Sequence, residues 1–212
     1  MDVSSYAPDW DTLKEVVEAM HRYAIPSPSP TDPLFALLLS HVHRPGGAQD
    51  VYALSAQFGP HALAVASSEH LLSLDLSTVS DEWADRCGAI YLKRMFFLHL
   101  GRIQALKRIV LVPLTLHASR AGCNRDEQQH NVLRPWMFAT AQLVVEAKYV
   151  HSSHVIFPYG NTSIYRADLS PSLIEGRLNP IVYRCSCSQC AEIMSARIKA
   201  ITQEWSSVKR TI

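Results

Sequence analysis

The chain has 212 residues, of which 48% are hydrophobic, and a formal net charge of +1. That is enough apolar residues to bury a core as one domain or as two small ones. No segment reaches the ~18 to 20 consecutive apolar residues of a membrane span, and the acidic start of the chain lacks the apolar stretch of a signal peptide. We therefore expect a cytoplasmic or nuclear protein without membrane contact, in which the five cysteines are thiols or metal ligands rather than disulfides.

The charges are unevenly distributed along the chain. Residues 1–85 contain twelve Asp and Glu against three Lys and Arg, whereas residues 86–125, the basic stretch, contain eight Lys and Arg and no acid. The basic stretch is interpreted either as the complement of the acidic first part or as a face for nucleic acid or an acidic partner. We favour the first, because the bases share a helix with large apolar groups and lack the aromatic and glycine pattern of RNA-binding modules.

Apolar residues recur mostly at helical spacing and glycine is scarce, so an all-α fold is predicted. A first helix is expected from Asp9 or Asp11 to about Tyr23, and alternating prolines then impose an extended linker. A second helix begins with Asp32 as its N-cap and Pro33 as its first residue. Third and fourth helices are expected at about residues 49–58 and 60–72.

The longest helical signal covers residues 80–111, with a serine that can cap its start and a proline shortly after its end. Gly101 is expected to mark a close helix contact or a bend. His99 and Arg102 fall on the apolar face. We expect a core histidine with a hydrogen-bonding neighbour and an arginine whose head reaches the edge, the alternative being a pH-sensitive or metal-binding His99.

The remainder predicts a helix from about residue 125 or 126 to 149, kinked at Pro135, then mostly loop over residues 150–180 around one short helix opened by Ser170 and Pro171. A last helix is expected at about 188–208. The predicted architecture is an irregular multi-helix bundle around one long central helix, with a loop-rich C-terminal part. Its two regions, residues 1–112 and 113–212, are expected to pack as one unit.

The segment CSCSQC, residues 185–190, is the most chemically suggestive part of the chain. Cys187 and Cys190 have the C-x2-C spacing that lets two thiolates share one tetrahedral metal ion at a helix start. A complete site needs two more ligands. The best candidates are Cys123 and His117, with Cys185 or His99 as substitutes. Buried or partly exposed thiols at the start of the last helix are the favoured interpretation. The alternative is a structural zinc site, for which the candidate ligands are Cys123, Cys187, Cys190 and His117.

Enzymatic uses of these residues have weaker support. A thiol-redox enzyme would place its C-x2-C after a strand, and this neighbourhood is helical. A hydrolase pairing Cys123 with a histidine lacks a local signature that selects the pair. The close histidine pairs, His41 with His43 and His151 with His154, are interpreted as solvated side chains, and no nucleotide-binding or hydrolase motif is present. No enzyme is therefore expected.

The segments YALSAQFG, LSTVSDEWADRCGAIYLKRMFFLHLGRIQALKRIV, CSCSQC and EWSSVKRTI, together with Cys123, resemble the region that follows the BTB/POZ fold in BTB-domain proteins of mushroom-forming fungi. The resemblance covers about residues 13–212 and implies action through protein–protein contacts. The BTB core itself should precede Trp10, and only a few residues do. We expect either a truncated gene product or a helical half that works alone, so dimerisation and ubiquitin-ligase recruitment through the BTB fold are not carried over.

The function expected from the sequence is a non-enzymatic protein-interaction or scaffold module. The alternative is a zinc-stabilised nucleic-acid-binding or regulatory protein that uses the basic stretch. The sequence names neither the partner nor the oligomeric state, and nucleic acid is not the expected partner.

Overall fold

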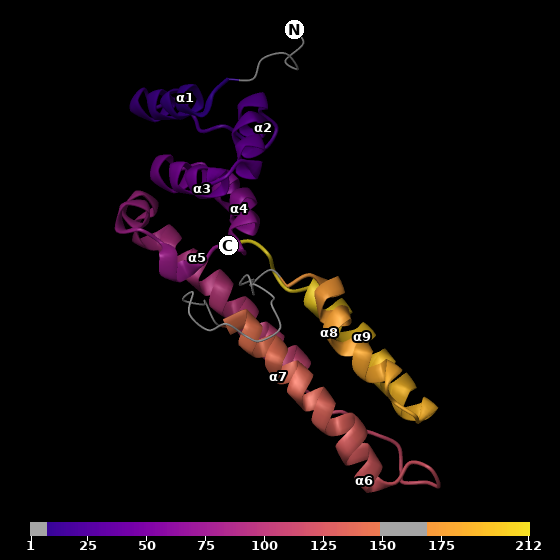
Figure 1. Ribbon diagram of the computed structural model, residues 1–212. Helices are drawn as coiled ribbons and strands as arrows, with labels where there is room; N and C mark the ends of the chain where they lie inside the picture. The colour runs from indigo at the N-terminus through magenta and orange to yellow at the C-terminus, as the bar shows by residue number, and fades with distance from the viewer. Residues whose placement is uncertain (1–7, 149–168) are drawn as a thin grey trace. The chain divides into compact units, whose positions relative to one another are not determined.

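The computed structural model describes residues 8–148 and 169–212 (Figure 1). These residues form helices joined by turns, which confirms the all-α fold. None of the described helices is long and apolar enough to cross a membrane. The chain divides into two compact units, Met1–Leu98 with Arg210–Ile212 and His99–Lys209. Each unit is described separately below, and the expected boundary at residue 112 stays a prediction.

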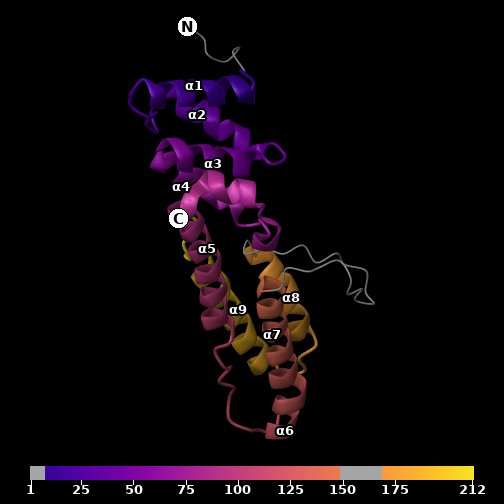
Figure 2. The same cartoon turned by 90° about the vertical axis from the view of Figure 1, so that its left-hand side faces the viewer.

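The first unit contains α1 (Trp10–Arg22), α2 (Pro33–Ser40), α3 (Gly47–Phe58), α4 (His61–Ser68) and the first part of α5 (Asp81–Val110) (Figure 2). The helix starts follow the capping residues. The Asp9 carboxylate accepts a hydrogen bond from the Thr12 amide at 2.8 Å, and Asp32 with Pro33 opens α2. One apolar cluster joins α1 to α4, with these buried members: Leu13, Val17, Phe35, Leu38, Val42, Val51, Leu54 and Leu63.

A second cluster in this unit packs α3 and α4 against α5, and it buries Tyr52 and Trp83. Both aromatic side chains have a partner for their polar atom. The Tyr52 hydroxyl donates to the Tyr91 carbonyl at 2.8 Å, and the Trp83 indole donates to the Gln49 carbonyl at 2.9 Å. Burying these rings therefore leaves no unpaired donor on them.

His41 lies in a short 3-10 turn after α2, buried with its ring centroid 5.4 Å from that of Trp10. The interpretation of this histidine as solvated is wrong, since the turn points it into the first cluster's edge beside an aromatic ring. His43 is exposed, and its ring contacts that of His70 at 5.2 Å.

Helix α5 is broken at Gly88, whose φ of 67° and ψ of 162° are not helical. Glycine reaches this conformation at little cost because it has no Cβ. The prediction that Gly101 marks a close contact or a bend is wrong. It continues the helix, and a Cβ added there would have no heavy atom within 4 Å.

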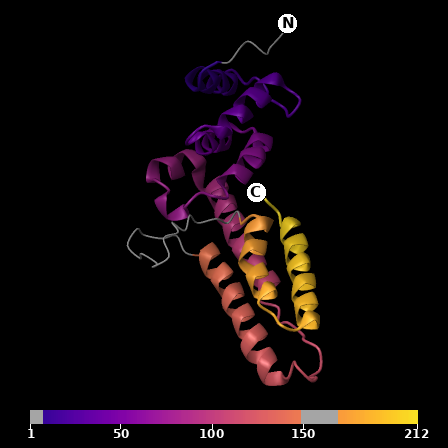
Figure 3. The ribbon, with the colours of Figure 1, turned by 45° about the vertical axis from the view of Figure 1, so that its right-hand side comes forward.

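The second unit contains the remainder of α5, then α6 (Arg125–Gln128), a π-helical turn (Gln129–Leu133), α7 (Arg134–Lys148), α8 (Pro171–Tyr183) and α9 (Ser188–Ser206). Figure 3 shows α7, α8 and α9 side by side. Their shared core includes these fully or nearly fully buried residues: Leu106, Val110, Trp136, Leu143, Ile174, Leu178, Met194, Ile198, Ile201 and Trp205.

Two prolines modify these helices. The irregularity expected at Pro135 takes the form of the π-helical turn just before it. Proline has no backbone N–H to donate, so the regular α-helical hydrogen-bond pattern cannot continue through this position. Pro180 lies inside α8, which continues to Tyr183. The expectation of loop through residue 180 around a short helix is therefore wrong for this part, whereas residues 150–168 lie outside the described residues.

Arg102 is one of the largest buried side chains, with 2% of its surface exposed. The prediction that its head reaches the edge is wrong. The guanidinium donates to the Val208 and Lys209 carbonyls at 3.0 and 2.9 Å, and it lies 4.3 Å from the centroid of the Trp205 ring. The chain just beyond α9 thus supplies acceptors, and the indole supplies a cation–π contact.

Candidate metal centre

The loop between α5 and α6 carries His117 and Cys123. Its end is a tight turn in which Arg120 and Cys123 exchange both backbone hydrogen bonds, at 3.2 and 3.0 Å. Gly122 occupies the left-handed region in this turn, with φ of 79°, where other residues would be strained. Asn124 follows at once as the N-cap of α6 in a reciprocal capping box with Glu127. The local sequence thus fixes the position of Cys123 from both sides.

The start of α9 carries the other two thiols. Cys187 is the N-cap residue, and Cys190 lies in the first turn. The Ala191 amide donates to the Cys187 carbonyl at 3.0 Å, so the helical pattern begins between the two cysteines. The C-x2-C spacing therefore turns both side chains to the same side.

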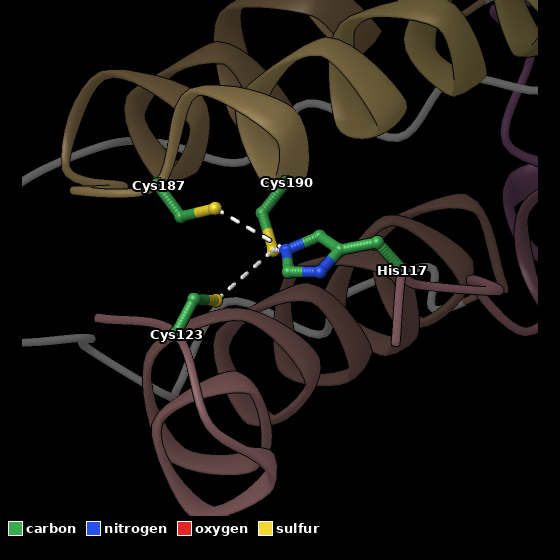
Figure 4. A group of neighbouring side chains, drawn as sticks. All are labelled: His117, Cys123, Cys187 and Cys190. Carbon is green, nitrogen blue, oxygen red and sulfur yellow. Dashed lines mark hydrogen bonds between the residues drawn. The ribbon is translucent and has the colours of Figure 1, made fainter. Parts of the chain in front are cut away.

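The four predicted ligand residues converge in space (Figure 4), and their ligand atoms all lie within 4.8 Å of one another. The His117 Nε2 atom is 3.2 Å from the sulfurs of both Cys187 and Cys190. The sulfurs of Cys123 and Cys190 are 3.7 Å apart. The three cysteines are buried and the histidine is partly buried.

These separations are close to those of a zinc tetrahedron. With Zn–S bonds of about 2.3 Å and Zn–N bonds of about 2.0 Å, neighbouring sulfurs lie about 3.8 Å apart and a sulfur and a nitrogen about 3.5 Å apart. The observed sulfur–sulfur distance of 3.7 Å fits this edge, and the nitrogen–sulfur distances of 3.2 Å are slightly short. Small side-chain movements would therefore place one ion in contact with all four atoms.

His117 is held in the tautomer that a metal ligand needs. Its Nδ1 lies 2.7 Å from the Ala118 carbonyl oxygen, which can only accept, so Nδ1 carries the proton and Nε2 presents its lone pair to the sulfurs. The buried Gln128 side chain of α6 donates to the His117 carbonyl at 3.1 Å and fixes the backbone. Metal-bound histidines characteristically donate their second N–H in this way.

The thiols have unequal proton affinities. The Cys190 backbone N–H, then the contacts to His117, Cys123 and Arg120, lower the pKa of Cys187 to about 6, against the effect of burial. The Arg120 guanidinium is 3.3 Å from the Cys187 sulfur. Burial raises the pKa of Cys190, and the neighbouring sulfurs add to that shift. One thiolate is thus favoured in the protein by itself, and a cation would be needed to stabilise more than one.

The substitutes considered for the site lie elsewhere. The Cys185 thiol donates to the Cys187 carbonyl at 3.4 Å and is not among the four clustered ligands. His99 is buried on α5 and is likewise outside the cluster. His151 and His154 lie outside the described residues. Sequence reasoning missed Arg120 and Gln128, since neither belongs to a recognisable motif.

The arrangement suits metal binding better than nucleophilic catalysis. A Cys–His hydrolase needs one histidine nitrogen directed at one accessible sulfur. Here two sulfurs share the same Nε2, a third lies beside them, and all three belong to the apolar core of the unit. Three soft thiolate donors and one imidazole are a donor set typical of structural zinc.

Comparisons of the chain with protein-family models, with curated proteins and with solved structures gave no match.

Proposed function

We propose that the chain is a zinc-stabilised helical module that acts through protein–protein contacts and not as an enzyme. The observation that carries the proposal is the convergence of four ligand atoms within 4.8 Å, from a loop and a helix start far apart in sequence. The ion would hold the α5–α6 loop to the start of α9. It would neutralise the charge of the thiolates and form coordination bonds with them.

Zinc is the metal that this donor set favours. Thiolate and imidazole ligands exclude Ca²⁺ and Mg²⁺, which prefer oxygen. Four protein ligands also fill the tetrahedron and leave no position for substrate or water, as in structural and not catalytic zinc sites. A role in stability is therefore proposed for the ion.

A protein-contact role is supported by the outer face of α7. Three large apolar residues, Met137, Phe138 and Val145, are each half or more exposed. Val145 follows Met137 by eight residues and Phe138 by seven, about two helical turns, so the three side chains lie on one side of α7. Exposed large apolar residues gathered on one helix face are typical of interaction surfaces. The resemblance to BTB-domain proteins agrees with this role and stays a prediction.

The alternative of nucleic-acid binding is less well supported, because several cations of the basic stretch have partners within the protein. Arg86 pairs with Asp50 at 3.4 Å. Arg94 lies over the Tyr91 ring at 5.0 Å. Arg120 contacts a sulfur of the metal centre, and the buried arginine of α5 is inaccessible. These groups would have to give up protein contacts to bind phosphate.

The zinc part of the proposal is tested by elemental analysis of the full chain, purified under reducing conditions and dialysed. Stoichiometric zinc is expected in the wild type and in Cys185→Ser, and it should be lost in Cys190→Ser. Zinc absent from the wild type would refute the proposal.

The partner part is tested by comparing the proteins captured by the wild type, by Phe138→Glu and by the polar control Gln142→Glu. Selective loss with Phe138→Glu is expected, whereas salt-sensitive retention on DNA would favour the alternative.

A further inference from the structure

Two thiols of the metal centre are placed to react with each other. Cys123 and Cys190 lie 67 positions apart in the chain, and their sulfurs are 3.7 Å apart. A disulfide requires about 2.05 Å, so a movement of less than 2 Å joins them. Cys123 lies in the turn before α6 and Cys190 lies in the first turn of α9, so the two sulfurs approach each other from separate segments.

The third thiol of the centre, Cys187, also contacts two nitrogen groups. The Cys187 sulfur contacts His117 Nε2 at 3.2 Å and the Arg120 guanidinium at 3.3 Å. Both contacts are to nitrogen atoms, whereas the Cys190 sulfur is the one that approaches Cys123 to 3.7 Å. Cys185 is directed to a backbone carbonyl at 3.4 Å and not to the cluster. The geometry therefore selects Cys123 and Cys190 as the pair.

We infer that a peroxide oxidises the centre by joining Cys123 to Cys190, so that the unit is held together by either a zinc ion or a disulfide. The inference rests on the proposed zinc site. In the first step one thiolate attacks the peroxide O–O bond, giving a sulfenic acid and hydroxide. In the second step the other thiolate attacks the sulfenic sulfur, the S–S bond forms, and a second hydroxide leaves. Two thiolates are oxidised and one peroxide is reduced.

Loss of these two ligands releases the ion. Only His117 and Cys187 would remain, and two ligands do not satisfy a tetrahedral zinc site. The new bond joins the same two segments that the ion had joined, the α5–α6 loop and the start of α9. The oxidised protein therefore keeps its helical fold while it gives up zinc, which makes the centre a redox-sensitive zinc store or switch.

The experiment uses the zinc-loaded full chain and its Cys185→Ser variant, each treated with hydrogen peroxide. Released zinc is followed with a chromogenic chelator. The disulfide is located by mass spectrometry after tryptic digestion without reduction, since Cys123 falls in the peptide AGCNR and Cys190 in CSCSQCAEIMSAR. In the variant the second peptide keeps only Cys187 and Cys190, and fragmentation distinguishes them.

The expected result is zinc release in step with a cross-link between the two peptides through Cys123 and Cys190, in the wild type and in Cys185→Ser, with unchanged helical circular dichroism. A disulfide between Cys187 and Cys190, sulfinic acid without a cross-link, or zinc retained after oxidation would overturn the inference while leaving the zinc site intact. Absence of zinc before peroxide is added refutes the proposed function itself and the release with it.

Discussion

The sulfurs of Cys123 and Cys190 lie 3.7 Å apart, within the apolar core that joins α5, α7, α8 and α9. Each of these cysteines is more than nine-tenths buried, and a metal ion between them would join the loop before α6 to the start of α9. Because the unfolded chain has no preformed site, the free energy of zinc binding would add to the stability of the folded unit.

Removing the metal is therefore expected to destabilise the second unit. Chelation of the reduced protein should lower its thermal midpoint, with a loss of several kcal/mol in unfolding free energy, given values of about 10–16 kcal/mol for zinc-finger peptides. The measurement is calorimetry with and without chelator. In Cys190→Ser the chelator should have no effect, and an equal response of wild type and variant would contradict a role for this site.

Arg120 is expected to tune the centre without being a ligand. Its guanidinium lies 3.3 Å from the Cys187 sulfur and would offset the negative charge of three thiolates and one Zn²⁺. Arg120→Gln should weaken zinc affinity by about 10- to 100-fold, as for other outer groups around metal sites. Competition titration with a chelator measures the change, and Arg125→Gln removes the same charge nearby as a control. Equal affinities in the two variants would show that only the overall charge matters.

The four candidate metal ligands could be predicted from the sequence, whereas the backbone that positions them could not. The C-x2-C spacing identified Cys187 and Cys190, and ligand chemistry suggested His117 and Cys123 as the best candidates for the other two ligands. Arg120 could not be selected, since its role depends on the turn at Gly122 that places it beside Cys187. The turn itself is local, but its position beside Cys187 depends on the packing of α9, which lies far along the chain.

The helices were anticipated where caps and periodicity act locally, as at Asp9 and Asp32. The failures occurred where packing overrides local preference. The break in α5 is at Gly88 and not at Gly101. Either glycine can adopt a non-helical conformation, so the sequence alone does not determine which of the two interrupts the helix. Pro180 is accommodated within α8, although proline by itself indicates a helix end.

Arg102 is expected to be a stabilising residue that lysine cannot replace. Its guanidinium donates to two backbone carbonyls and lies over the Trp205 ring, an arrangement that uses a planar group with several donors. Arg102→Lys should cost about 2 kcal/mol or more, since one buried carbonyl loses its partner. Urea unfolding of the full chain measures this. The exposed control Arg108→Lys should be nearly neutral, and a similar result for both variants would contradict the assigned role.

His41 should make stability depend on pH. Burial, and then the nearby Arg44 charge, lower its pKa below the usual value near 6.5. The unfolded state then binds the proton first, so this contribution is present above about pH 7 and is lost as pH falls through 6.5 towards the lowered pKa of the folded state. Denaturant unfolding at pH 7.5 and pH 5.5 tests the sign. His41→Phe should lose less stability on acidification than the wild type, and His43→Phe serves as the exposed control. A larger acid loss in His41→Phe would reverse the expected sign.

The most direct test of the zinc centre is X-ray absorption spectroscopy at the zinc edge of the purified, reduced full chain. The Cys3His centre predicts three sulfurs at about 2.3 Å and one nitrogen at about 2.0 Å around a four-coordinate ion. In Cys123→Ser the sulfur count of any remaining zinc should fall, and in Cys185→Ser it should not. A zinc ion surrounded by oxygen and nitrogen alone, or a three-sulfur shell that is unchanged after loss of both Cys123 and Cys190, would contradict the site.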